Sequence, residues 1–167
     1  MTLGANWGAT ADECTMPMAC DELLPGARVR VHRAVSVHAQ PSTVFRWLCQ
    51  LKLAPYSYDL LDNFGRRSPR KLVRGCEHLE IGQRFMSIFS LRSFAHDEHL
   101  TLRSRSVAVT YAVLSDNGLT RLFARVLFNP RGPLGAAPVT HLLAFGDLVM
   151  MRKQLLTLKA LAEREAG

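Results

Sequence analysis

The carboxyl-terminal segment, residues 147–165, constrains the fold more than any other part of the chain, because its apolar residues recur at helical spacing. The opposite side of this segment carries Arg152, Lys153 and Lys159. The apolar stripe consists of Leu148, Met151, Leu155, Leu158 and Ala162, with Leu156 and Leu161 on its flank. This pattern predicts a long amphipathic helix with one face in the core. Such a face needs a sheet to cover it.

Strand-like segments precede this helix and supply the sheet. In residues 28–38, valines alternate with polar residues, which is typical of a half-buried strand. Arg33 is the odd member of the valine face. The sequence Asp116-Asn117-Gly118 predicts a tight hairpin turn. Further strands are predicted over residues 84–94, 98–105, 107–115 and 119–128.

Two short helices are predicted to follow the first strand. Pro41 suits a first helical turn, and the apolar residues after it recur at helical spacing. Residues 56–63 predict the second helix, with Gly65 as a left-handed cap. We expect residues 66–80 to form an edge strand and loop. Residues 129–138 are rich in proline and glycine and predict the loop before the final helix.

Length and composition fit one globular domain with an N-terminal extension. The chain has 167 residues, of which 48% are hydrophobic and 21% charged, as in folded domains generally. Residues 1–26 show no periodicity, so we expect a partly ordered extension, with a single domain over residues 27–167. No apolar stretch approaches a membrane span and the amino end lacks signal-peptide features, so we expect a cytoplasmic location.

The order of these elements resembles a known fold family. The stretch at residues 33–48, Arg-Ala-Val-Ser-Val-His-Ala-Gln-Pro-Ser-Thr-Val-Phe-Arg-Trp-Leu, is similar to the strand-to-helix opening of the polyketide-cyclase and lipid-transport branch of the START/Bet v 1-like (SRPBCC) superfamily. The likeness spans residues 28–165. It implies an α+β helix-grip fold in which a curved antiparallel sheet and the closing helix enclose an apolar cavity for lipids, sterols or polyketides. No catalytic set is shared across this superfamily, so no catalytic residue is implied.

The predicted hairpin of residues 107–115 and 119–128 provides one wall of the expected cavity. Alternation places its apolar residues on one face and Arg121 and Arg125 on the other. The same apolar residues would also suit a solid core, although Met150 and Met151 favour a pocket because thioethers adapt to varied shapes. The candidate ligand-binding residues are Arg33, Tyr56, Tyr58, Val109, Tyr111, Val113, Ala124, Val126, Phe128, Met151 and Leu155.

Polar side chains among these candidates have more than one interpretation. Arg33, among inward valines, must pair with a carboxylate, extend to the rim or meet an anionic ligand. Its candidate carboxylate partners are Asp59, Asp62 and Glu80. Each tyrosine combines an apolar ring with a hydroxyl, which suits either the polar group of a ligand or a backbone partner.

The chain is basic, with a net charge of +7 and an isoelectric point near 9.7, which favours acidic partners. Basic residues concentrate at Arg66, Arg67, Arg70, Lys71 and Arg74. The simplest interpretation is an exposed edge that repels partner sheets. The alternative is a weak contact with an anionic membrane or with RNA. Aromatic residues are not interleaved with this run, which disfavours single-strand binding by stacking.

Familiar catalytic and metal motifs are missing from the sequence. It contains no HExxH, GxSxG, Walker or GxGxxG pattern. His96-Asp97-Glu98-His99 has metal-capable side chains, but alternation at a turn splays them to opposite faces. The four cysteines form no CxxC pair. We therefore predict free thiols, no metal and no cofactor.

These observations predict a protein that binds, and in one version transports, a small hydrophobic or amphipathic ligand in a cavity between the sheet and the C-terminal helix. One alternative is an enzyme of the polyketide cyclase or dehydratase kind, in which a tyrosine, histidine or aspartate moves a proton. A second alternative is a basic interaction module that contacts the ribosome, RNA or an anionic membrane. The sequence leaves the oligomeric state open.

Overall fold

The computed structural model describes residues 5–58, 66–116, 118–129 and 137–167. Its seven-stranded sheet has the strand order β1-β2-β7-β6-β5-β4-β3. All neighbours pair antiparallel except β1, which runs parallel to β2. The strands are β1 (Asn6–Trp7), β2 (Val29–Val37), β3 (Arg84–Phe85), β4 (Phe89–Ala95), β5 (His99–Arg103), β6 (Val107–Asp116) and β7 (Leu119–Phe128). The predicted α+β fold is confirmed.

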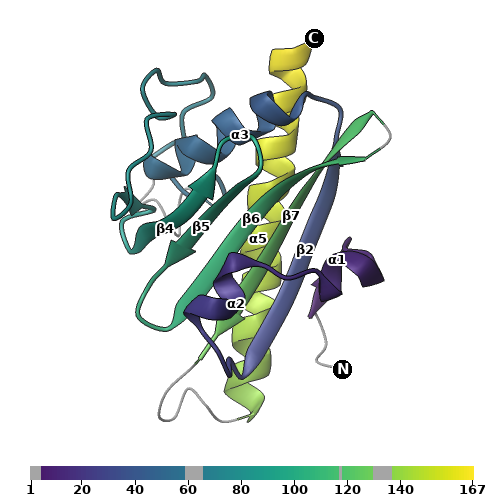
Figure 1. Ribbon diagram of the computed structural model, residues 1–167, viewed down its shortest axis with the longest axis vertical. Helices are drawn as coiled ribbons and strands as arrows, with labels where there is room; N and C mark the ends of the chain where they lie inside the picture. Colours follow the sequence, from purple (N-terminus) through teal and green to yellow (C-terminus); the bar gives the residue numbers. More distant parts are fainter. Residues whose placement is uncertain (1–4, 59–65, 117, 130–136) are drawn as a thin grey trace.

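The long helix α5 (Ala137–Ala166) packs across one face of this sheet, here called the inner face (Figure 1). Met151, Leu155, Leu158, Leu161 and Ala162 are buried on it, as the stripe predicted. Leu156 is 40% exposed, so it lies outside the buried stripe and not on its flank. The helix begins at Ala137, well before residue 147, and Pro138 is compatible with this start because a missing N–H in the first turn costs no hydrogen bond.

The helix predicted after the first strand is present as α3 (Pro41–Cys49), which continues into the short 3-10 helix η1 (Gln50–Lys52). Of the helix predicted over residues 56–63, residues 56–58 are not helical and residues 59–63 lie outside the described residues, as does the predicted cap Gly65.

Residues 66–80 form a loop without the predicted edge strand. No strand forms here because the side-chain amide of Gln50, and not a neighbouring strand, pairs with the backbone polar groups of Val73. Its Nε2 donates to the carbonyl of Val73 at 3.1 Å, and its Oε1 accepts from the amide of Val73 at 3.0 Å. The edge of the sheet is formed instead by β3.

The opposite, outer face of the sheet is covered by the N-terminal segment. Figure 1 shows α1 (Ala11–Thr15) and α2 (Ala19–Leu23) on the side of the sheet away from α5. Alanines at this face permit a close approach, and the second apolar cluster comprises Met18, Cys20, Leu24, Ala34, Ala108, Ala112, Phe123 and Leu127. The segment also carries Trp7, whose ring lies 5.3 Å from the guanidinium carbon of Arg152 on α5.

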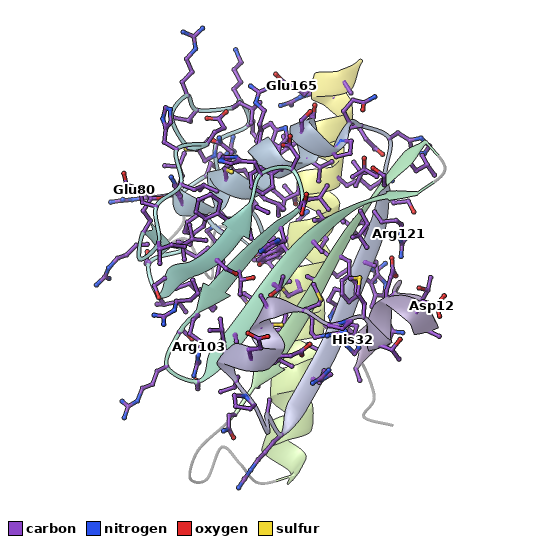
Figure 2. All side chains as sticks on the ribbon, viewed as in Figure 1. Asp12, His32, Glu80, Arg103, Arg121 and Glu165 are labelled. Atoms are coloured by element: carbon purple, nitrogen blue, oxygen red, sulfur yellow. The ribbon has the colours of Figure 1, made fainter. Side chains whose placement is uncertain are left out.

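Two arginines of β7 fasten this segment to the sheet. Arg125 is 1% exposed and donates to Asp21 Oδ2 at 2.6 Å, to the carbonyls of Glu13 and Cys14, and to His32 Nε2 at 3.2 Å. Arg121 binds both carboxylate oxygens of Glu13, at 2.9 and 2.8 Å. Figure 2 shows Arg121 and His32 on the side of α1 and α2. The predicted face of these arginines is correct, but it is covered by the chain itself.

These contacts alter the protonation of two groups. Burial, reinforced by the charge of Arg125, lowers the pKa of His32 to about 4. Burial alone would raise the pKa of Glu13, but the hydrogen bonds and charge of Arg121 and the amide of Thr10 lower it overall. At neutral pH the outer face therefore holds an uncharged imidazole at His32 and an ionised carboxylate at Glu13.

Candidate ligand-binding pocket

An open pocket of about 470 Å³ lies between the inner face of the sheet and α5. Strands β6 and β7 form its wall, α5 its cover, and the β3–β4 turn its mouth. Its lining residues are Pro55, Ser57, Met86, Ser87, Ile88, Phe89, Val107, Val109, Tyr111, Val126, Phe128, Met150, Met151 and Gln154. The lining is mostly apolar, and none of these described residues carries a formal charge.

The wall of the pocket follows from strand alternation and register. Val107, Val109 and Tyr111 are two residues apart on β6, so their side chains project to the same face. Across the ladder, Val107 pairs with Phe128 and Val109 pairs with Val126. Cross-strand pairs of this kind place large apolar side chains side by side.

The same face is solid at the other end of the hairpin. Val113 and Leu122, also paired on β6 and β7, are 5% and 0% exposed and belong to the main core cluster. Helix α3 contributes Phe45 and Trp47 to that cluster, and it contacts β6, β7 and α5. The pocket therefore occupies the part of the inner face that α3 does not fill.

One chain of hydrogen bonds runs within the lining of this apolar pocket. The hydroxyl of Tyr111 donates to Oε1 of Gln154 at 2.7 Å. Nε2 of Gln154 donates to the carbonyl of Pro55 at 2.6 Å and also lies 3.5 Å from Sδ of Met86. Gln154 is 3% exposed, so the burial of its amide is compensated by these bonds. The chain holds Oε1 of Gln154 in the pocket lining.

The mouth of the pocket is an unusual turn. Met86 and Ser87 both have positive φ, 46° and 64°, which few residues other than glycine adopt. Arg84 donates to the carbonyl of Ser87, which helps to fix the turn. Ile88 lines the pocket and is nevertheless 70% exposed, so it lies at the rim.

The structure brings several sequence-predicted candidates together around this pocket. Those that line it are Val109, Tyr111, Val126, Phe128 and Met151. Val113, Ala124 and Leu155 are buried on the same inner face, in the solid part of the core. Tyr56 is 1% exposed and contacts the ring of Trp47 edge-on. Tyr58 is 39% exposed at the surface and is not among the lining residues.

Arg33 lies away from the pocket. It is fully buried on the inner face of β2, opposite Ala124 in the ladder. Its Nη1 donates to the carbonyl of Ala5 at 3.1 Å and to the carbonyl of His32 at 2.8 Å. These acceptors are backbone groups beside β1. Of its candidate carboxylate partners, Asp59 and Asp62 lie outside the described residues, and Glu80 is exposed.

Two parts of the pocket were missed in the sequence. Gln154 is a polar residue one turn after Met151, where it interrupts the apolar stripe of α5. This interruption was the sequence signal that could have indicated a polar group in the pocket. The turn at Met86 and Ser87 was hidden because residues 84–94 read as one continuous strand. Neither residue is a type that marks a left-handed turn.

The remaining reactive side chains are placed elsewhere. All four cysteines are free, and burial raises the pKa of Cys49 to about 12, so its thiol stays protonated. His96 lies beside the rings of Phe45 and Phe94. Within the described ranges, no three or more histidine, cysteine, aspartate or glutamate side chains converge as metal ligands would.

No described helix combines the length and apolar character needed to cross a bilayer.

Comparisons with known proteins support the fold. No protein-family model matches the chain, and no curated protein matches it. Among solved structures, TTHA0849 from Thermus thermophilus is 15% identical, with 83% of this chain and 99% of that chain covered and a TM-score of 0.53. Protein MLL2253 from Mesorhizobium loti is 12% identical, with 81% and 97% covered and a TM-score of 0.53. The KanY protein is 13% identical, with 83% and 99% covered and a TM-score of 0.51.

Identities this low show the fold alone. The likeness to TTHA0849, MLL2253 and KanY therefore supports the predicted helix-grip architecture. Membership of the START/Bet v 1-like superfamily, and of its polyketide-cyclase and lipid-transport branch, stays a prediction.

Proposed function

We propose that this protein binds a small, uncharged, hydrophobic molecule that carries a hydrogen-bond donor, in the pocket under α5. The observation that supports this proposal most directly is an apolar pocket of about 470 Å³ with a single buried side-chain amide, that of Gln154, in its lining. Pockets for small molecules commonly measure about 300–1,000 Å³ and combine an apolar lining with few polar groups. Burial of apolar ligand surface, at about 25 cal/mol per Å², would supply most of the affinity.

The amide of Gln154 argues for a ligand with a donor group. Both amide hydrogens are engaged, one with the carbonyl of Pro55 and one near Sδ of Met86. Its Oε1 accepts from Tyr111, and an amide oxygen has two lone pairs. A ligand hydroxyl or N–H is therefore complementary to this oxygen. A carboxylate is not, because no described lining residue carries a positive charge.

Binding is favoured over catalysis by the same lining. General acid–base chemistry needs a group that exchanges a proton near neutral pH. Among the described lining residues only Tyr111 is titratable, and its hydroxyl donates to Gln154. A cyclase or dehydratase remains an alternative that the pocket itself does not favour.

A filled-pocket variant tests the proposal. Native mass spectrometry of the purified protein, followed by organic extraction, should detect a retained apolar molecule. Naphthol, an uncharged aromatic molecule with one hydroxyl donor, serves as the probe. Fluorescence titration should show that it binds the unmodified protein saturably. Val109→Phe places extra volume in the pocket wall and should weaken naphthol binding at least tenfold. Leu156→Phe adds the same ring on the exposed side of α5 and should leave binding unchanged.

A second titration tests the polar preference. Naphthoate should bind at least tenfold more weakly than naphthol at neutral pH, because its charge finds no partner in the lining. Gln154→Leu should reduce this preference. The proposal would be contradicted if Val109→Phe and Leu156→Phe lost naphthol binding equally, or if naphthoate bound more strongly than naphthol.

A further inference from the structure

We propose that the basic loop, residues 66–77, docks the protein on an anionic phospholipid surface. This inference is independent of the pocket. The loop borders a cleft of about 520 Å³ whose lining residues are Arg46, Arg70, Lys71, Leu72, Arg74, Glu77, Arg164 and Glu165. Figure 2 shows Glu165, which lines this cleft, near the top of the molecule, and Arg103, which donates to the carbonyl of the pocket residue Val107, well below it.

Three separate elements bring positive charge to this cleft. Arg46 comes from α3, Arg164 from the last turn of α5, and Arg70, Lys71 and Arg74 from the basic loop. Of the two carboxylates in the lining, Glu77 is paired with Arg46 at 3.3 Å. No acidic residue occurs between residues 66 and 74. The cationic side chains of the loop are all exposed, and these are Arg66, Arg67, Arg70, Lys71 and Arg74.

The backbone of the basic loop is fixed by contacts from buried and neighbouring side chains. Gln50, which is fully buried, holds both backbone polar groups of Val73. Lys52 donates to the carbonyl of His78, directly after the loop, at 2.5 Å, and Arg164 donates to the carbonyl of Arg70 within it. The loop thus presents its cations from a preorganised backbone, which lowers the entropic cost of docking.

One exposed apolar residue favours a membrane over nucleic acid. Val73 is 41% exposed between Lys71 and Arg74, and Gln50 fixes its backbone. Basic side chains around an apolar residue match the headgroup and acyl boundary of an anionic bilayer. Binding of single-stranded RNA normally uses aromatic platforms, and residues 66–83 contain no phenylalanine, tyrosine or tryptophan.

Vesicle co-sedimentation tests the proposal with the full chain. At low salt the protein should sediment with vesicles of phosphatidylcholine mixed with phosphatidylglycerol, and not with phosphatidylcholine alone. Added salt should release it, because surface charges are screened. The triple variant Arg70→Gln, Lys71→Gln, Arg74→Gln should lower the partition coefficient roughly a hundredfold, about 3 kcal/mol.

A matched variant controls for net charge. Arg28→Gln, Arg92→Gln, Arg105→Gln removes the same charge from exposed side chains elsewhere and should leave most of the binding in place. Val73→Trp should give a blue-shifted emission with the anionic vesicles, over the background of Trp7 and Trp47. Absence of vesicle binding at low salt would overturn the proposal, and so would equal losses of vesicle binding in the two triple variants. It would also be overturned if the Val73→Trp emission stayed unshifted with vesicles while polyuridylate displaced the protein from them.

Discussion

The two faces of the sheet are buried in different ways. The outer face is closed by the N-terminal segment of the chain, with small residues at the contact and two arginines that each make several hydrogen bonds. The inner face is covered by α3 and α5, and it divides into a solid part and a pocket of about 470 Å³. Both faces are largely apolar, but their hollows differ. The inner face holds the apolar pocket under α5, whereas the hollow of about 490 Å³ beside the N-terminal segment is also lined by the polar residues Glu98, His99 and Thr110.

The difference shows that cavity formation depends on the covering element more than on the strands. The segment around the short helix α2 carries the side chains of Met18, Cys20 and Leu24, which pack in one cluster with alanines of the sheet. Helix α5 is straight and long, and it crosses a face lined with valines and aromatic residues. Without α3 beneath it, the space near Val107 and Phe128 stays open. Close packing beneath α2 and an apolar pocket beneath α5 therefore come from the same strands.

The largest expected effect tests the closure of the outer face. Arg125→Met should lower the free energy of unfolding by about 3–5 kcal/mol, because Asp21 and two backbone carbonyls lose their buried partner. Urea denaturation measures the change. Arg92→Met, on an exposed side chain of β4, is the control and should change stability by less than about 0.5 kcal/mol. A small effect of Arg125→Met would show that the arginine does not hold the segment.

The second prediction concerns the close approach at the start of the N-terminal segment. Gly8 has a φ of 77°, and a Cβ there would lie 2.2 Å from the carbonyl oxygen of Ala34. Gly8→Ala should cost about 2–4 kcal/mol, from left-handed strain together with overpacking. Gly26 has a φ of 72° and open space around it, so Gly26→Ala should cost only about 1 kcal/mol. Equal thermal shifts in the two variants would contradict the predicted contact.

The third prediction compares the solid and hollow parts of the inner face. Val113 and Val109 lie on the same strand and face and are 5% and 3% exposed, but only Val109 lines the pocket. Val113→Ala should cost roughly 2 kcal/mol, since it leaves a new cavity in a packed core. Val109→Ala should cost roughly 1 kcal/mol, because the space left by the removed methyl groups joins the existing pocket and does not form a separate cavity. Chemical denaturation measures both, and the reverse order would argue that the pocket is filled.

The smallest expected effect is a pH dependence of the folding stability, which arises from His32 on the outer face. Because His32 has a pKa of about 4 in the folded protein and an ordinary value near 6.5 when unfolded, the unfolded state binds the extra proton between these values. Stability should therefore fall as the pH drops from 6.5 towards 4, by on the order of 1 kcal/mol between pH 7 and pH 5. Urea denaturation at the two pH values measures it. His32→Gln should flatten this dependence, and an unchanged slope would assign it to other groups.

Much of the sheet could be predicted from local patterns. Residues 119–128 and 107–115 are rich in β-branched and aromatic residues on either side of a turn sequence, and the strands observed there match the predicted limits within one residue. The turn at Met86 and Ser87 could not be predicted, because tertiary contacts hold non-glycine residues at positive φ against their local preference. The position of Arg33 likewise depended on a backbone acceptor at Ala5, contributed by a distant part of the chain.

The sequence by itself determined which side chains share a face, because strand and helix periodicities are local properties of the backbone. It thereby set the α+β class, the buried stripe of α5 and the wall that contains Val109, Tyr111 and Val126. Only the tertiary structure decided that the N-terminal segment covers the outer face and that part of the inner face remains hollow. Those outcomes depend on how elements far apart in the chain fill one another's volume, and periodicity carries no information about volume.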